Sequence, residues 1–181
     1  MAGINRSLKG NLNLSETRKY IGVKCVFISH QKSDKEICKK IADYLLAADI
    51  DVYFDEYDES LKSYRQSNRP AGVVDSIKEG INKSSHMLIV VSPNTLDSKW
   101  VPWEVGYAYD NTVLSVLTLK GIQDNHLEDY LKTVPIIRGT KSLNVYISTI
   151  ANISVPLLES SKRLMNHAIS HPLDNYLDWN Q

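Results

Sequence analysis

Short apolar segments that alternate with amphipathic ones constrain this chain more than any other feature of its sequence. Four apolar segments have the length of a buried strand: residues 23–28, 51–54, 86–91 and 113–119. Three segments between them repeat apolar residues at helical spacing: residues 34–48, 74–81 and 98–109. Alternation of strands and helices predicts an α/β fold, in which helices cover both faces of a parallel sheet.

Smaller elements are expected between and after these segments. Residues 134–137 predict a short edge strand, where Pro135 is tolerated. Residues 124–131 and 142–150 predict short helices. Residues 55–72 have no clean period and predict a long loop, and a loop of that length inside a compact domain is usually functional.

The same pattern divides the chain into three parts. Residues 1–20 form a polar leader that we expect to be loose or to dock late, and residues 21–150 form the α/β domain. Residues 151–181 form a C-terminal helical extension with an amphipathic helix around residues 156–169. The apolar residues among 176–179 are sufficient to pack this extension on the domain.

Charge and composition exclude several classes of protein. The 21 basic residues balance the 21 acidic ones, which argues against a nucleic-acid-binding protein. The longest purely apolar run, Met87 to Val91, is far shorter than the ~20 residues of a membrane span. The first 20 residues are polar and lack an apolar core, so we expect no signal peptide. Cys25 and Cys38 are expected to be buried thiols rather than zinc ligands. We therefore expect a cytoplasmic protein without a membrane or metal site.

Ligands of open parallel sheets bind beyond the carboxyl ends of the strands, so the residues that follow each strand are the candidates. These are Ser29, His30, Gln31 and Lys32, then Asp55 with its loop, then Ser92 to Asn94. The glycine fingerprint of dinucleotide folds, the P-loop and the nucleophile elbow are all absent, as is the acidic pair of a phosphoacceptor domain. Ser92 to Asn94 fits turn chemistry at least as well as a ligand site.

Trp100 and Glu104 stand four residues apart, so on a helix they share one face. A carboxyl group beside an indole is poorly solvated, which raises its pKa. Such a pair suits cleavage of a glycosidic bond, since the carboxylate stabilises an oxocarbenium ion and the ring stacks on a planar base. The same spacing also suits a core anchor next to a carboxylate that the helix dipole favours. Arg65 and Arg69 either hold phosphates or belong to a solvated charged loop.

Six short motifs occur in an order that resembles the Toll/interleukin-1 receptor (TIR) domain of the bacterial stand-alone type. They are residues 26–30, 34–36, 52–55, 76–77, 88–93 and 98–100 with Glu104, and together they span about residues 23–150. The resemblance implies a flavodoxin-like fold with a five-stranded parallel sheet. Pro102 and Trp103 depart from what many members have at the start of this helix.

The resemblance also implies function. Members with this glutamate cleave or cyclise NAD+, which is a substrate and not a cofactor. Glu104 matches the catalytic glutamate, and Trp100 matches the tryptophan of the ribose and base site. Ser29, His30, Gln31 and Lys32 match the loop on the nicotinamide and phosphate side, and Asp55 begins the loop that gates the pocket. That loop, residues 55–72, implies self-association through TIR–TIR contacts. Bacterial members of this type often act in antiphage defence, as in Thoeris systems, where a separate effector protein senses the cyclic ADP-ribose-type product.

Two other interpretations stay open. A non-catalytic TIR module would act by assembly alone and would have no chemical need for Glu104. An enzyme similar to nucleoside deoxyribosyltransferases would share the sheet topology and use a glutamate nucleophile. It would exchange bases on free nucleosides and would need no cations for phosphate.

Overall fold

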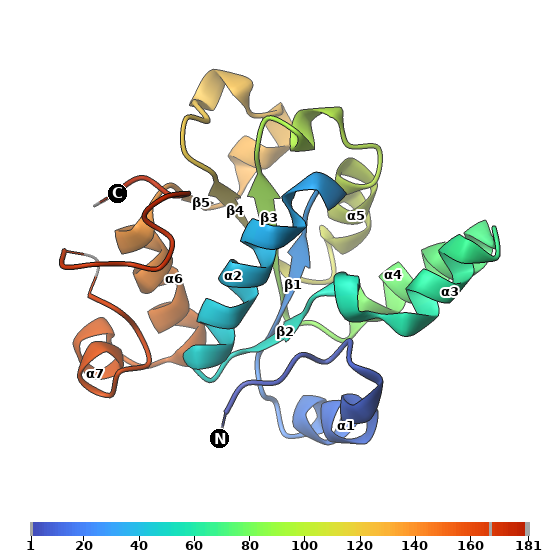
Figure 1. The fold of residues 1–181 in the computed structure, drawn as a ribbon, viewed down its shortest axis with the longest axis horizontal. Coiled ribbons are helices and arrows are strands. Elements are labelled where there is room, and N and C mark those ends of the chain that lie inside the picture. Colours follow the sequence, from blue (N-terminus) through green and yellow to red (C-terminus); the bar gives the residue numbers. More distant parts are fainter. Residues whose placement is uncertain (1, 167, 180–181) are drawn as a thin grey trace.

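The computed structural model describes residues 2–166 and 168–179 and shows a parallel sheet between two layers of helices (Figure 1). The strands are β1 Cys25–Ser29, β2 Asp51–Tyr53, β3 His86–Val91, β4 Val113–Thr118 and β5 Ile136–Ile137. Their order is β2-β1-β3-β4-β5, and all neighbouring pairs are parallel. This is the strand order of flavodoxin, so the predicted α/β fold is confirmed.

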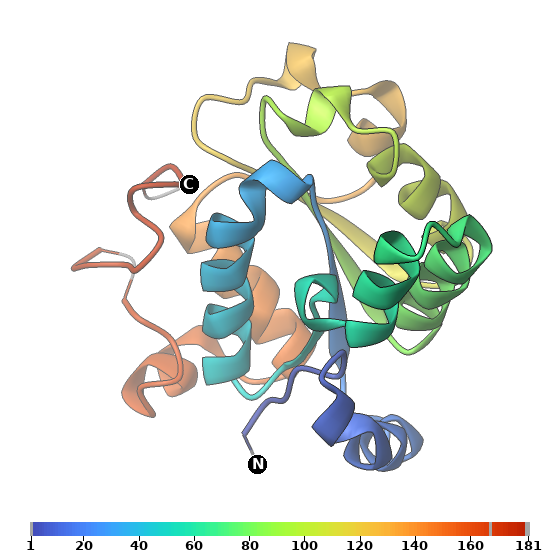
Figure 2. The same ribbon diagram turned by 45° about the vertical axis from the view of Figure 1, so that its right-hand side comes forward.

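Both faces of the sheet are buried, which is why its strands are continuous apolar runs. One face packs against α2 Lys35–Ala47, α6 Thr140–Ala151 and α7 Val155–Ser160. The other packs against α4 Pro70–Asn82 and α5 Val101–Ala108. The two layers lie on opposite sides of the central strands in Figure 2. The carboxyl ends of β1, β2 and β3 therefore meet between the first turns of α2 and α5.

Residues 55–72 are more regular than predicted. They contain a 3₁₀ turn, Asp55–Tyr57, then α3 Glu59–Gln66, and from Pro70 the first residues of α4. Asp58 is the N-cap residue of α3, and its side chain accepts a hydrogen bond from the Leu61 N–H at 3.0 Å. Among the residues of α3, Leu61 is the one that is buried, so the helix leaves no apolar period in the sequence.

The N-terminal residues are packed on the domain, which excludes a loose leader and leaves the alternative of a leader that docks. They form a 3₁₀ turn, Lys9–Asn11, and α1 Leu12–Tyr20, and Asn5 pairs in parallel with Val52 at the edge of the sheet. Arg6 and Arg18 are almost fully buried because both form ion pairs with Asp51. Charged residues usually remain exposed unless they are paired, so the sequence alone could not show this docking.

The C-terminal extension is less helical than predicted. The expected helix over residues 156–169 is replaced by α7, which ends at Ser160, followed by turns. Leu164, Leu173 and Leu177 are nevertheless buried in the core. Residues 124–131, expected as one helix, contribute to two separate 3₁₀ segments, Asp124–His126 and Asp129–Thr133. Residues 1, 167, 180 and 181 of the predicted leader and extension lie outside the described residues.

Cys25 and Cys38 are buried free thiols, as expected. Within residues 2–166 and 168–179, no helix has both the length and the apolar character that crossing a bilayer requires.

Candidate active site

A polar cavity of about 250 Å³ opens at the carboxyl ends of β1 and β2, beside the first turn of α5. Its lining residues are His30, Gln31, Lys32, Asp55, Glu56, Arg65, Trp100 and Glu104. The fold thus brings the predicted site residues to one cavity, and Ser29 lies behind it in contact with Glu104. Larger cavities of about 420, 440 and 710 Å³ lie elsewhere, and among the described residues none of the three is lined by a predicted site residue.

Glu104 is the most unusual group of the cavity because it is a carboxyl group with only 6% of its surface exposed. Its pKa is raised to about 7: burial is the main cause of the rise, the nearby charge of Asp55 adds to it, and Arg65 opposes it. The buried Ser29 hydroxyl donates a hydrogen bond to Oε2 of Glu104 at 2.6 Å, which also lowers this pKa. Glu104 is therefore poised to exchange a proton near neutral pH.

Trp100 lies at the rim of the same cavity, one turn before Glu104. The backbone N–H of Glu104 donates to the carbonyl of Trp100 at 2.9 Å, so the two side chains share a helical face as their spacing predicts. The indole is 42% exposed and meets Trp103 edge to face, with ring centroids 5.8 Å apart. A half-exposed indole beside a buried carboxyl group offers a planar ligand a surface for stacking.

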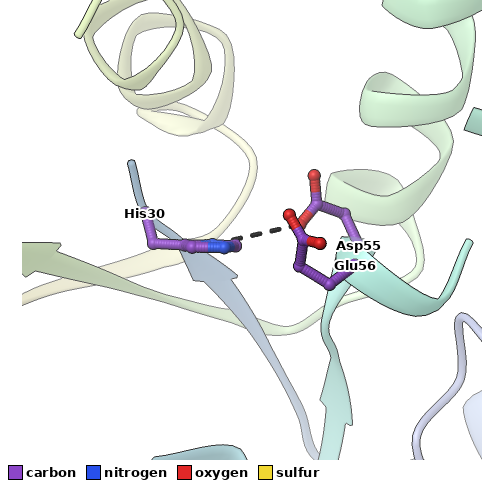
Figure 3. Close-up of side chains that lie close together, drawn as sticks. All are labelled: His30, Asp55 and Glu56. Carbon is purple, nitrogen blue, oxygen red and sulfur yellow. Dashed lines mark ion pairs between the residues drawn. The ribbon is translucent and has the colours of Figure 1, made fainter. Parts of the chain in front are cut away.

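His30 follows β1 and packs its ring against Phe54, with centroids 5.0 Å apart. Its Nδ1 lies 3.1 Å from the carbonyl oxygen of Ile28 and 3.9 Å from Oδ1 of Asp55 (Figure 3). The Nε2 atom is buried and has no hydrogen-bond partner among the described residues. A donor or acceptor left free in this way is available to a ligand.

Asp55 lies between two cationic or potentially cationic groups. Its Oδ2 is 3.6 Å from Nη2 of Arg65, while its Oδ1 faces His30. Burial raises the pKa of Asp55, and the charges of His30 and Arg65 work in the opposite direction. Asp55 and Arg65 thus bring charge into the same cavity as Trp100 and Glu104.

The ligating atoms of His30, Asp55 and Glu56 lie within 4.8 Å of one another, a spacing that a divalent cation could bridge after small movements (Figure 3). However, the Arg65 guanidinium already lies beside Asp55, and Nδ1 of His30 already contacts the Ile28 carbonyl. We therefore assign no metal site to this cluster.

The structure adds Glu56 to the predicted site residues and selects Arg65 from the two arginines considered for phosphate. Glu56 follows Asp55 directly, and its position after β2 was the signal that could have identified it. Arg65 reaches the cavity from α3, whereas Arg69, the other arginine considered for phosphate, is exposed and does not line it. The arginine from α3 could be selected only once the segment had folded as a helix.

Ser92 and Asn94 have a structural role at this edge of the sheet. The Ser92 hydroxyl donates to Oδ2 of Asp34 at 2.5 Å, and the Asn94 amide donates to Oδ1 at 2.7 Å. These bonds tie the turn after β3 to the turn that begins α2. The turn chemistry expected from the sequence is thus present, and neither residue lines the cavity.

Comparison with known proteins agrees with this architecture. A profile of the TIR domain family matches residues 26–142, which is more than half of the chain. The chain belongs to the TIR domain family. A similar protein is a probable 3′ cyclic ADP-D-ribose synthase, ThsB′, of Bacillus cereus (strain MSX-D12), which is 26% identical over 106 residues. The match covers 58% of this chain and 53% of the relative, so the chain spans about half the length of that protein.

All residues that line the cavity of this TIR domain fall inside the matched segment. The packed N-terminal residues precede the match, and α7 with the C-terminal turns follows it. The cavity therefore lies within the segment that matches the TIR family, while the two terminal segments lie outside it.

Proposed function

We propose that this TIR protein cleaves NAD+ at the bond between nicotinamide and ribose. The observation that supports the proposal most is the buried Glu104, with its pKa raised to about 7, held by Ser29 at a cavity whose rim carries an exposed indole. The similarity to a protein named as a probable 3′ cyclic ADP-D-ribose synthase supports the same chemistry.

In this proposal the nicotinamide end of NAD+ enters the cavity between Trp100 and His30. Drug-sized ligands usually occupy pockets of about 300–1,000 Å³. A cavity of about 250 Å³ therefore holds the nicotinamide and its ribose, and the rest of the dinucleotide extends over the rim. Lys32 and Arg65 line the cavity and can pair with the phosphates of NAD+ where the dinucleotide passes over the rim.

The bond from ribose C1′ to the nicotinamide nitrogen then breaks, and its electron pair leaves with nicotinamide. This neutralises the positive charge of the ring, so the leaving group needs no proton. The ribose becomes an oxocarbenium ion, which the carboxylate of Glu104 stabilises at short range in a poorly solvated site. Ser29 fixes the orientation of that carboxylate through its 2.6 Å hydrogen bond.

A nucleophile completes the reaction at C1′. Water gives ADP-ribose, with its proton taken up by Glu104, whereas an adenine nitrogen of the same molecule gives a cyclic ADP-ribose. We propose that the nucleotide product serves as a signal in antiviral defence that a separate effector protein senses. We also propose that the TIR domains associate with one another through the segment 55–72.

The proposal is tested by incubating the purified full-length protein with NAD+ and identifying the products by chromatography and mass spectrometry. We expect nicotinamide together with either ADP-ribose or a cyclic product whose mass is that of ADP-ribose less one water. Glu104→Gln should lower kcat at least 100-fold, because one oriented charge at the reacting centre typically contributes about 10²–10³. Glu128→Gln, the same change at an exposed position, should behave as the wild type.

Two outcomes would contradict this proposal. NAD+ that persists with the wild type at high protein concentration would rule out the cleavage and favour a non-catalytic module. Equal turnover by Glu104→Gln would rule out the role of the glutamate. A parallel incubation with a free nucleoside and a second base tests exchange, which we do not expect.

A further inference from the structure

The N-terminal segment adds a short strand-like stretch to the edge of the TIR sheet, beside β2. The Val52 N–H donates to the carbonyl of Ile4 at 3.0 Å, and the Arg6 N–H donates to the carbonyl of Val52 at 2.8 Å. This stretch precedes the matched TIR core, which begins at residue 26. It therefore lies outside the segment that the TIR family profile matches.

The same segment holds both backbone polar groups of Phe54, the residue that precedes Asp55. The Phe54 N–H donates to Oδ1 of Asn5 at 3.3 Å, and the Ser7 hydroxyl donates to the Phe54 carbonyl at 2.6 Å. Asn5 is preorganised, since its Oδ1 also accepts the Ser7 N–H at 3.1 Å. Asn5 and Ser7 are both buried, so water competes weakly for these bonds.

Arg6 anchors this arrangement from between the two residues. Its Nε lies 2.8 Å from Oδ2 of Asp51, and its terminal nitrogens donate to the carbonyls of Lys83 and Val23 at 3.0 and 2.8 Å. Arg6 is 1% exposed. A guanidinium with its donors directed at fixed acceptors is a rigid attachment point, so Asn5 and Ser7 cannot drift away from Phe54.

Asp55, in contrast, has little support from other side chains. Its Oδ1 has no hydrogen-bond partner among the described residues, and its ion pairs with His30 and Arg65 are long, at 3.9 and 3.6 Å. The position of the Asp55 carboxylate consequently depends on the backbone of Asp55, which is held in place through the preceding residue, Phe54. The His30 ring packs on the Phe54 ring, so it depends on the same residue.

We propose that Asn5 and Ser7 are positioning residues, which set the placement of Asp55 and His30 in the cavity by holding the backbone of Phe54. This inference rests on the proposed NAD+ cleavage for its effect on catalysis. The positioning itself is a property of the ligand-free protein and can be measured separately.

The first measurement is the ¹H–¹³C spectrum of the histidine rings in the full-length protein without NAD+. Ser7→Ala should shift the His30 ring signals, while the signals of His86, at the other end of the sheet, should stay in place. The second measurement is NAD+ cleavage, in which Ser7→Ala should lower kcat/KM about tenfold, because small misplacements of site groups cost up to about 10²-fold.

Three control variants separate positioning from general destabilisation. Ser15→Ala removes a buried hydroxyl from the same segment that has no hydrogen-bond partner among the described residues. Ser148→Ala removes a hydroxyl that donates to the Ile153 carbonyl at 2.7 Å on the far side of the molecule. Neither should move the His30 signals or kcat/KM. Ser7→Thr keeps the hydroxyl and should restore both.

A Ser7→Ala variant whose His30 signals and kcat/KM both match the wild type would overturn the inference. So would a Ser7→Thr variant with the full losses of Ser7→Ala, or a Ser148→Ala variant with the same shifts. Wild-type protein that cleaves no NAD+ would refute the proposed function alone, since the ring signals would still decide whether Ser7 positions His30.

Discussion

The burial of Glu104, which suits the proposed catalysis, also makes the folded protein less stable when this carboxyl group is ionised. Its folded pKa of about 7 lies above the ordinary value of 4.5, because burial disfavours the charged form. The folded state therefore binds a proton more tightly than the unfolded state between these two pH values, and stability falls as the pH rises through this window. At pH 8 the folded protein holds an ionised, buried carboxylate at a cost of about 3 kcal/mol, from about 1.4 kcal/mol for each pKa unit.

We therefore expect Glu104→Gln to be more stable than the wild type at alkaline pH. The gain should be about 3 kcal/mol at pH 8 and only about 1 kcal/mol at pH 5, where the folded carboxyl group is already neutral. Urea denaturation of both proteins at the two pH values measures the difference. A gain that is equal at pH 5 and pH 8 would mean that Glu104 does not titrate in this window.

The N-terminal segment is the element whose role the sequence concealed. Arg6 and Arg18 converge on one carboxylate at the start of β2, with Nε of Arg6 2.8 Å and Nη2 of Arg18 2.6 Å from Asp51. Asp51 is fully buried, and both arginines are nearly so. Removing one partner of a buried ion pair leaves an uncompensated charge, which is far more costly than losing an exposed pair.

Asp51→Asn should therefore destabilise the protein by about 3–5 kcal/mol, since it leaves two buried guanidinium groups without an anion. Arg6→Gln and Arg18→Gln should each cost less, because the remaining arginine still pairs with Asp51. Asp43→Asn is the matched control, as Asp43 is 60% exposed and its pair with Lys39 is long, at 3.6 Å. Chemical denaturation of the four variants gives the order, and an Asp51→Asn loss below about 1 kcal/mol would contradict it.

At the scale of the whole molecule, the C-terminal turns complete the core that α2 and α6 begin. Leu173 and Leu177 have no exposed surface and belong to the same apolar cluster as Val26 and Ile28 of β1. The carbonyl of Tyr176 accepts the Lys120 N–H at 2.8 Å, so backbone bonds reinforce this contact. The C-terminal turns and the TIR core should consequently unfold together.

Leu173→Ala should lower the free energy of unfolding by about 2–5 kcal/mol, the usual cost of emptying a buried leucine site. Trp179→Ala, a larger truncation in the same turns at a 58% exposed position, should cost less than about 0.5 kcal/mol. Circular dichroism and tryptophan fluorescence should report one transition for the wild type and for both variants. Two separated transitions would show that the C-terminal turns form an independent unit.

The periodicity and spacing of apolar residues were sufficient to predict the central sheet and the helices that cover it. The strands of the sheet are apolar because both faces are buried, and α2, α4 and α5 have apolar stripes because each covers one face. The rule that ligands bind at the carboxyl ends of parallel strands then selected Ser29 to Lys32 and Asp55. Helical spacing placed Trp100 beside Glu104. These patterns are local in the sequence, so they can be recognised without coordinates.

The remaining features depend on contacts between residues far apart in the chain. Arg65 reaches Asp55 only because α3 forms over a segment with a single buried side chain, Leu61. Arg6 is buried only because Asp51, 45 residues away, supplies its charge partner. Neither helix α3 nor the N-terminal strand-like stretch repeats apolar residues at a regular period. Ion pairs and hydrogen bonds between distant residues decide where these two segments pack. Such pairs form only in the folded chain, so they leave no periodic pattern in the sequence.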